Sequence, residues 1–487
     1  MKTVVIGSGF GGIASALRMR AKGHDVTLIE KLDQVGGRAQ QFKRANYLHD
    51  AGPTVITAPN LFYELFELFN EKLEDHLEFK PLDPWYRFYF VNGFEFDYVP
   101  DREKMLNQIE SINLSDVDGY NRMLKRAQEI FEIGYLKLAD QPFHKLSTMI
   151  RYAPDILRLK GYQSVYQFVS TYLKDENLRQ VFSIQPLLVG GNPFQTSSIY
   201  ALIHALEQKW GIYFAMGGMG KVVHELKNLM IRQGVEIKTN HEVEKFETTM
   251  NSISNIIIKN KPSIKPDIVI SNADPITVNN YFLDNQKISL QNRFLKKYAK
   301  HSMGLFVLFF GTKAKYNKVA HHTIWMGPRY KELLNDIFNK KILAEDFSIY
   351  LHRPTATDET FASKGSDSFY ALVPVPNLQA SIPWEEIKMD YAKKIVKALS
   401  KTIMPNLENV IDDLFVMTPE NFKDSYMTPH GSGFSIAPIL TQSAWFRTHN
   451  KDDYYKNLFY VGAGTHPGAG VPGVLNSAKV VERIIHG

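Results

Sequence analysis

A glycine-rich segment near the carboxyl end of the chain has the residue types of a ligand-binding loop. Residues 462–473 contain five glycines and two prolines, with Gly464 inside the segment. An apolar run at residues 458–461 precedes the loop and is typical of a buried strand, and a helical pattern is expected to begin at Asn476 and Ser477. Glycine permits close backbone approach, and a helix amino terminus favours an electron-rich or anionic group. The segment therefore predicts a binding site for such a group.

The amino-terminal residues indicate which ligand this is. Residues 2–6 and 25–29 form β-branched, strand-like runs, and residues 13–22 between them repeat apolar side chains at helical spacing. The glycines between the first strand and the helix fit the G-x-G-x-x-G spacing, and an acid ends the second strand, where it can accept hydrogen bonds from a ribose diol. This order of elements predicts a dinucleotide site. Its contacts are Gly7, Gly9, Phe10, Gly11, Gly12 and Glu30.

The following residues favour FAD over NAD as the dinucleotide. Gly36, Gly37 and Arg38 resemble the second glycine pair of two-dinucleotide-binding flavoproteins, in which backbone and an arginine approach the FAD diphosphate. Residues 234–244, which include Val243, resemble the strand and turn that present backbone groups to the adenine. Residues 268–273 resemble the strand that returns to the flavin domain. Each piece alone could be ordinary sheet, but together they predict FAD.

Composition assigns any redox chemistry to the cofactor. The chain has 487 residues, is 44% hydrophobic and contains no cysteine, which excludes redox dithiols, thiolate nucleophiles, cysteine-ligated metals and flavin attachment through sulfur. The first residues lead directly into a strand, and no apolar run approaches ~18 residues. We expect a cytoplasmic globular protein with two or more layered domains.

Basic residues gather in one part of the chain, although the formal net charge of +6 is mild. Residues 141–172 combine aromatic and aliphatic side chains with a single acid, Asp155, and with the cations Lys145, Arg151, Arg158 and Lys160. This composition suits a helix lying on anionic lipid, but composition alone favours an amphipathic core helix with a basic outer face. No nucleic-acid-binding motif accompanies these residues, so we expect no nucleic-acid partner.

The flavin-binding pieces are separated in sequence, which predicts long insertions. Residues 1–60, 215–275 and 455–487 are expected to form one discontinuous FAD-binding domain. Residues 61–120 and 276–454 are expected to form a substrate-binding domain, and residues 121–214 a helical subdomain. The patterns predict helices at residues 60–69 and 384–403, a hairpin at residues 86–98, and strands at residues 305–310, 348–352 and 369–374.

Nine segments carry a resemblance that covers almost the entire chain. They are residues 4–18, 36–39, 49–57, 134–138, 187–207, 217–220, 327–330, 440–447 and 462–473. Through them the sequence resembles the bacterial-type phytoene desaturases, which belong to the carotenoid/retinoid oxidoreductases. The resemblance implies an α/β, Rossmann-like FAD-binding fold of the two-dinucleotide-binding, amine-oxidase-like type. It also implies an α+β substrate domain and makes residues 121–214 a membrane-facing insertion.

The resemblance implies an activity and its partners. The expected reaction converts 15-cis-phytoene through carotene intermediates to all-trans-lycopene, with hydride transfer to the flavin and quinone or dioxygen as the electron acceptor. Each methylene that leaves water is worth about 0.8 kcal/mol, so a forty-carbon hydrocarbon must be drawn from a bilayer. Membrane lipid thus becomes a predicted partner, and residues 141–172 become the predicted docking surface. The expected location is the cytoplasm, peripherally at the inner face of the cell membrane.

The resemblance also suggests residues around the flavin ring. It places Gly52, Pro53 and Thr54 beside the ring, and Pro472, Gly473 and Val474 on its other side. The candidate acids or bases are Glu207, Asp346 and His466, although structurally held carboxylates and histidines are commoner. The cation that develops is allylic and delocalised, so a strong side-chain base is not needed; whether a side-chain base is used stays open, and the catalytic residue stays unassigned.

Several alternatives stay open. No metal site is expected, because His321 and His322 are adjacent and cannot share a helix face. The chain could instead be a diapophytoene desaturase, a carotenoid isomerase or ketolase, a flavin amine oxidase, or an escort protein that lacks flavin. The intact glycine motifs argue against the escort. The number of desaturation steps, the terminal acceptor and the oligomeric state, a homo-oligomer included, are not determined by the sequence.

Overall fold

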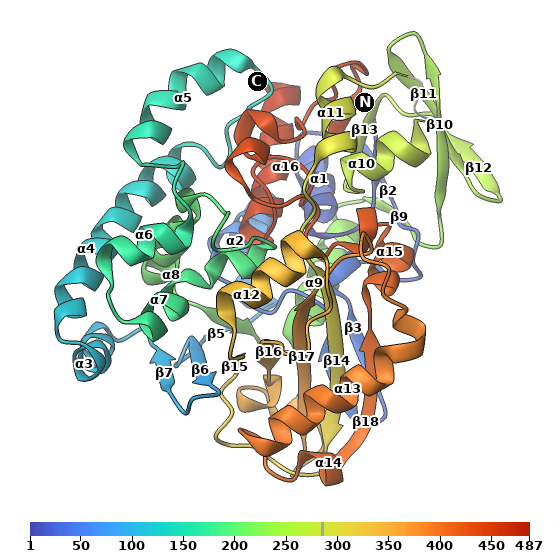
Figure 1. The fold of residues 1–487 in the computed structure, drawn as a ribbon. Helices are drawn as coiled ribbons and strands as arrows, with labels where there is room; N and C mark the ends of the chain where they lie inside the picture. The colour runs from blue at the N-terminus through green and yellow to red at the C-terminus, as the bar shows by residue number, and fades with distance from the viewer. Residues whose placement is uncertain (284–286) are drawn as a thin grey trace.

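A five-stranded parallel sheet gathers both ends and the middle of the chain. The computed structural model describes residues 1–283 and 287–487 (Figure 1). Every pairing in this sheet is parallel, and its strands apart from the edge strand at residues 236–238 are almost wholly buried, as expected for β-branched runs covered on both faces. The strand order is β19 (Leu458–Tyr460), β13 (Ile268–Ser271), β1 (Lys2–Ile6), β2 (Asp25–Ile29) and β9 (Glu236–Lys238).

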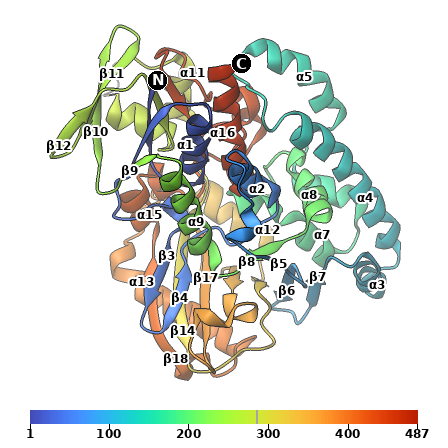
Figure 2. The same ribbon diagram turned by 180° about the vertical axis from the view of Figure 1, so that it is seen from behind.

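Two helices from opposite ends of the chain pack side by side on this sheet. They are α1 (Phe10–Ala21) and α16 (Val471–His486), which Figure 2 shows next to each other. The chain between β9 and β13 forms an antiparallel sheet of β10 (Val243–Thr249), β11 (Ser252–Ile258) and β12 (Lys261–Ile264). The α1–α16 contact brings the amino-terminal glycine turn to the carboxyl-terminal loop.

A seven-stranded sheet forms the second layered unit, in the lower half of Figure 1. Helix α13 (Trp384–Lys401) covers one face, where Phe306 packs against Trp384 and Tyr391. The strand order is β18 (Ile411–Met417), β14 (Gly304–Thr312), β17 (Asp367–Val375), β16 (Ile349–His352), β15 (His322–Met326), β6 (Tyr86–Phe90) and β7 (Glu95–Tyr98).

Helices occupy the flank of the molecule beside these sheets (Figure 1). They are α3 (Arg102–Ile112), α4 (Ser115–Phe131), α5 (Leu146–Arg158), α6 (Val165–Tyr172), α7 (Glu176–Ser183) and α8 (Leu202–Trp210). Helix α5 has no fully buried residue. Among the described residues, no helix combines the length and the apolar character needed to cross a bilayer.

The remaining helices and strands connect these units. They are β3 (Gln41–Arg44), β4 (Tyr47–Asp50), α2 (Asn60–Glu67), β5 (Phe79–Pro81), β8 (Tyr213–Ala215), α9 (Gly218–Arg232), α10 (Pro275–Thr277), α11 (Leu290–Tyr298), α12 (Tyr330–Asn335), α14 (Leu407–Val410) and α15 (Pro419–Tyr426).

Most predicted elements are present, and one predicted boundary is wrong. The βαβ unit, the hairpin of β6 and β7, strands β14, β16 and β17, and helices α2 and α13 are confirmed. Helix α16 begins at Val471, not at Asn476 and Ser477. Pro472 stands in its first turn, and the Ser477 hydroxyl donates back to the Val474 carbonyl at 2.6 Å, so this serine lies inside the helix. The division into three domains stays a prediction.

Candidate cofactor and substrate site

The amino-terminal glycine turn is packed too closely for side chains. A Cβ on Gly9 would lie 2.7 Å from Asn272 Nδ2, and one on Gly11 would lie 3.0 Å from the Gly462 nitrogen. Since Asn272 follows β13 and Gly462 follows β19, the turn touches two other chain segments at the carboxyl edge of the sheet. A Cβ on Gly12 would lie 2.0 Å from the Gly7 oxygen, so Gly12 allows α1 to pack on β1. The absent side chains leave a backbone cradle at this edge.

Glu30 and the second glycine pair are connected to this cradle through Ser8. Glu30 Oε2 accepts hydrogen bonds from the Ser8 backbone at 2.8 Å and from its hydroxyl at 2.6 Å, and the Gly36 nitrogen donates to the same hydroxyl at 3.1 Å. Gly36 and Gly37 have positive φ values of 116° and 55°, and a Cβ on Gly37 would meet Gly9 at 3.2 Å. The two predicted dinucleotide motifs therefore form one continuous turn region.

Arg38 supplies a positive charge beside this region. Its Nε is buried without a hydrogen-bond partner. Burial lowers the pKa of the guanidinium, and the nearby Asp274 carboxylate counteracts this effect. A buried cation with an unused donor is stabilised by an anionic partner. The open backbone cradle and the unsatisfied arginine together fit the diphosphate of a dinucleotide such as FAD.

One cavity of about 590 Å³ joins the predicted cofactor residues to a largely apolar chamber. Every predicted cofactor contact lines it except Gly12. These residues are Gly7, Gly9, Phe10, Gly11, Glu30, Gly36, Gly37, Arg38, Gly52, Pro53, Thr54, Val243, Gly464, Pro472, Gly473 and Val474. The chamber beyond them is lined by side chains of the helical flank, among them Ile133, Leu138, Met149, Ile156, Leu188 and Leu206. Which of these residues contact FAD stays a prediction.

A chain of hydrogen bonds runs along the cavity wall beside Gly52 and Thr54. Tyr370 donates to the Gly52 carbonyl at 3.0 Å, and the Thr54 hydroxyl bonds with Tyr350 at 2.7 Å. The Tyr350 hydroxyl also bonds with Nδ1 of His322 at 2.8 Å. Burial raises the pKa of both tyrosines and lowers that of His322 to about 3, so all three side chains are neutral. The sequence did not predict this series of hydrogen bonds, because the residues that form it come from segments far apart in the sequence.

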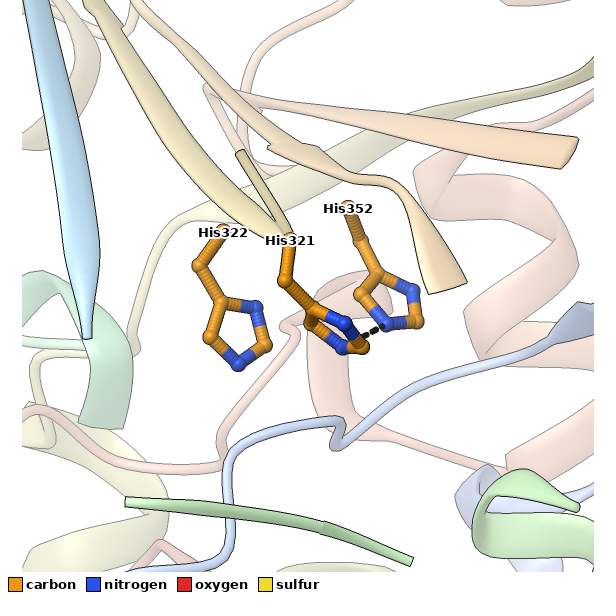
Figure 3. Close-up of side chains that lie close together, drawn as sticks. All are labelled: His321, His322 and His352. Atoms are coloured by element: carbon orange, nitrogen blue, oxygen red, sulfur yellow. Dashed lines mark hydrogen bonds between the residues drawn. The ribbon is translucent and has the colours of Figure 1, made fainter. Parts of the chain in front are cut away.

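Figure 3 shows His322 close to His321 and His352, and all three histidines are buried. His321 and His352 share a hydrogen bond of 3.1 Å between their Nε2 atoms, and His321 Nδ1 bonds with Thr357 at 2.7 Å. One ring nitrogen of each histidine lies within 4.8 Å of the others, a spacing that could hold a metal ion. The helix-face argument against a metal does not apply, because His322 begins β15 and pairs with His352 of β16. The group contains no carboxylate and does not line the cavity, and the absence of a metal stays a prediction.

Glu207 of α8 places a carboxyl group in the lining of the apolar chamber. It is fully buried, and neither of its oxygens has a hydrogen-bond partner. Burial raises its pKa to about 8, and the neighbouring Tyr98 and Tyr86 hydroxyls offset only part of that effect. At neutral pH the side chain is therefore an uncharged carboxylic acid.

The other two candidate acids or bases differ from Glu207. His466 lines the cavity, where its Nε2 bonds with the Leu138 carbonyl at 3.3 Å, and burial lowers its pKa to about 4. It is thus a neutral histidine held by backbone. Asp346 does not line the cavity; it forms an ion pair with Arg329.

Arg447 is a further residue that sequence reasoning did not select. Its buried guanidinium donates to four backbone carbonyls and so fastens the glycine-rich loop to the segment before it. The acceptors are those of Ile436, Gln442, Ala463 and Thr465. The sequence could have indicated this residue only by its position at the end of residues 440–447, one of the segments that carry the family resemblance.

The predicted docking residues lie on the surface. Lys145, Arg151, Arg158 and Lys160 are all exposed. Met149 and Ile156 of the same segment line the cavity. Leu146, Ile150 and Leu157 of α5 are also exposed, so this helix is not the amphipathic core helix that composition alone favours. Its contact with lipid stays a prediction.

Comparison with known proteins places the chain in a family. A family profile described as flavin containing amine oxidoreductase matches residues 10–481. The chain is 43% identical over 485 residues to a phytoene desaturase (lycopene-forming) from Pseudescherichia vulneris, covering 99% of each. It is also 43% identical over 484 residues to the enzyme of the same name from Pantoea ananas, covering 99% of this chain and 98% of the other. A solved oxidoreductase from Methanosarcina mazei shares the fold, with a TM-score of 0.68 at 15% identity and coverage of 99% and 100%.

Proposed function

The chain belongs to the flavin-containing amine oxidoreductases, and we propose that it is an FAD-dependent phytoene desaturase that forms lycopene. The observation that best supports this proposal is one cavity that joins a charged, glycine-lined end to an apolar chamber. An amine substrate would need polar partners in that chamber. Glu207, the buried carboxyl group there, is uncharged at neutral pH, which suits a hydrocarbon instead.

The chain's own residues bind the cofactor and align the substrate. The cradle at Gly7, Gly9 and Gly11 brings backbone N–H groups to the diphosphate, and Arg38 balances its charge. Glu30 stands at the end of β2, where it can accept from a ribose. When bound, FAD supplies the hydride acceptor. The apolar chamber excludes water and holds the reacting carbon–carbon bond in place.

The proposed substrates of the chamber are phytoene and the carotene intermediates. Successive desaturations would convert 15-cis-phytoene to all-trans-lycopene, with electrons leaving for a quinone or dioxygen. The positive charge that develops is allylic, so the neutral His322, His466 and Glu207 need not act as strong bases.

The source of such a substrate is a membrane. The exposed cations of α5 and its exposed apolar residues suit contact with an anionic bilayer, and the same helix lines the cavity. These features support a peripheral location at the inner face of the cell membrane. Neutralising Arg151, Arg158 and Lys160 together should lower liposome binding, and unchanged binding would remove α5 from this role.

The test of activity uses phytoene in liposomes with FAD and a quinone. Absorbance then resolves the products by the length of their conjugated system, and lycopene is the expected product. The absence of any new conjugated chromophore would refute the desaturase assignment, whereas a shorter or longer chromophore would correct the number of steps. A thirty-carbon substrate supplied in parallel separates this function from that of a diapophytoene desaturase.

A further inference from the structure

Helix α11 (Leu290–Tyr298) presents an apolar stripe to solvent. Leu290, Phe294 and Tyr298 recur every four residues and are 80%, 61% and 58% exposed. The helix is anchored on its other side, where Asn292 and Leu295 are buried. Large apolar side chains are rarely left in such a row without a partner.

Basic residues share helix α11 with this stripe. Residues 290–300 contain the cations Arg293, Lys296, Lys297 and Lys300 and no acid. The Lys297 ammonium lies 5.1 Å from the centre of the Tyr298 ring, so cationic and aromatic groups share one surface. This combination suits lipid headgroups above an apolar layer.

Helix α11 is connected to α5 through one short turn. Gln291 donates to the carbonyls of Trp445 at 2.7 Å and Arg447 at 2.9 Å, and α5 packs against the turn Ala444–Phe446. Phe446 of that turn is 41% exposed. Figures 1 and 2 both show α5 and α11 at the same end of the molecule. The two amphipathic helices therefore flank a turn that also exposes an aromatic ring.

The same turn region borders the cavity. Leu440, Ser443 and Ala444 line it, as do Met149 and Ile156 of α5. A bilayer that touched α5, the turn and α11 would thus lie against a wall of the chamber that holds the substrate.

We propose that α11 and the turn Ala444–Phe446 join α5 in a single docking surface for an anionic bilayer. Two helices on one bilayer fix the tilt of the molecule, which a single helix does not. This proposal rests on the proposed function, because the need for a membrane comes from the proposed hydrocarbon substrate. Lipid binding itself can be measured without substrate.

Charge favours a bilayer over a second copy of the chain as the occupant. In a two-fold dimer the same patch meets itself, so Arg293 and Lys297 would face their own copies. Lysine is also depleted at the centres of protein interfaces. An anionic bilayer attracts these same residues.

The experiment compares binding to phosphatidylglycerol-containing and pure phosphatidylcholine vesicles that hold no phytoene. Changing Leu290, Phe294 and Tyr298 together to Ser should lower the partition coefficient on anionic vesicles about tenfold. Arg293→Gln with Lys297→Gln should abolish much of the preference for anionic over neutral vesicles. The matched control is Met389→Ser with Lys397→Gln on α13, an exposed pair at the other end of the molecule, and it should bind like the unaltered chain. Flavin absorbance and the unfolding temperature report that each variant is folded.

Two results would overturn the proposal. One is that the folded triple variant binds anionic vesicles as strongly as the unaltered chain does. The other is a change in oligomeric mass on mutation without loss of lipid binding, which would make the patch a contact between copies. The triple variant should also desaturate phytoene normally in detergent but more slowly in liposomes. If the unaltered chain desaturates phytoene in neither medium, the proposed function fails while the lipid-binding result stands.

Discussion

The buried carboxyl group of Glu207 should make the stability of this protein depend on pH in an unusual direction. Its pKa is raised from 4.5 to about 8 by burial. Between these values the folded state holds a proton that the unfolded state has lost, so the free energy of unfolding falls as pH rises. Glu207 does not change the free energy of unfolding below about pH 4.5, and it lowers this free energy by the full amount above about pH 8.

The size of the effect follows from the shift. One pKa unit corresponds to about 1.4 kcal/mol, so the buried group costs about 3 kcal/mol at pH 7 and about 5 kcal/mol above pH 8. Glu207→Gln keeps the size of the side chain but cannot ionise. Unpaired amide atoms in the variant add a cost that does not change with pH, so the useful quantity is the change in the stability difference between pH 5 and pH 8.5.

Thermal unfolding of the FAD-loaded protein measures this quantity. With 487 residues, the unfolding entropy is roughly 1 kcal/mol/K if the chain unfolds as one unit. The Tm of Glu207→Gln relative to the unaltered chain should therefore rise by about 3 °C between pH 5 and pH 7, and by about 4 °C between pH 5 and pH 8.5. Glu386→Gln, at an exposed position of α13, controls for the loss of one carboxylate. A Tm difference that does not change with pH would show that Glu207 is not protonated in the folded state.

Four further outcomes are expected. Above pH 8 an ionised Glu207 places a charge in the apolar chamber, so the KM for phytoene should rise between pH 7 and pH 9 in the unaltered chain and stay level in Glu207→Gln. Gly11→Ala places a carbon 2.6 Å from Asn272 Oδ1 and should weaken FAD binding about tenfold in a fluorescence titration; equal affinity would contradict the close-packed cradle. Arg447→Met leaves four carbonyls unpaired and should lower the free energy of unfolding by about 3–5 kcal/mol in denaturant, and an unchanged midpoint would count against this role. Elemental analysis after growth with zinc should find less than ~0.1 ion per chain, because an ion at His322 and its two neighbouring histidines would have to replace the hydrogen bond between the ring nitrogens of those neighbours; one ion per chain would contradict this.

The parts of the site that the sequence predicts are those encoded locally. The turn at Gly7, Gly9 and Gly11 needs its glycines at fixed spacing between a strand and a helix, so the residues themselves indicate the structure. Ser477 shows where local reasoning fails. It has the residue type of a helix start, but it donates to Val474 and accepts from the Gly462 nitrogen at 2.9 Å, so its function depends on a loop fifteen residues away.

Other features depend on strand pairing or on exposure, neither of which a single sequence displays. His352 meets His322 because β15 and β16 pair in that register. Asp346 lies three residues before β16, yet its side chain turns to Arg329 and away from the cavity. The stripe of α11 could equally have been a core face, since its spacing is the same in both cases.

The distribution of charge along the cavity connects these observations to the chemistry. The Glu30 carboxyl group and the Arg38 guanidinium stand at the glycine-lined end, whereas burial leaves Glu207, His322 and His466 neutral elsewhere in or beside the chamber. A fixed carboxylate beside a polyene would hold the developing allylic cation at one position and oppose movement of the hydrocarbon to the next bond. A neutral carboxylic acid and neutral imidazoles do not hold the cation at one position, because their interaction with it is short-ranged. In the proposed reaction, the burial that makes these groups costly to ionise would therefore also let one chamber serve successive positions along the same hydrocarbon.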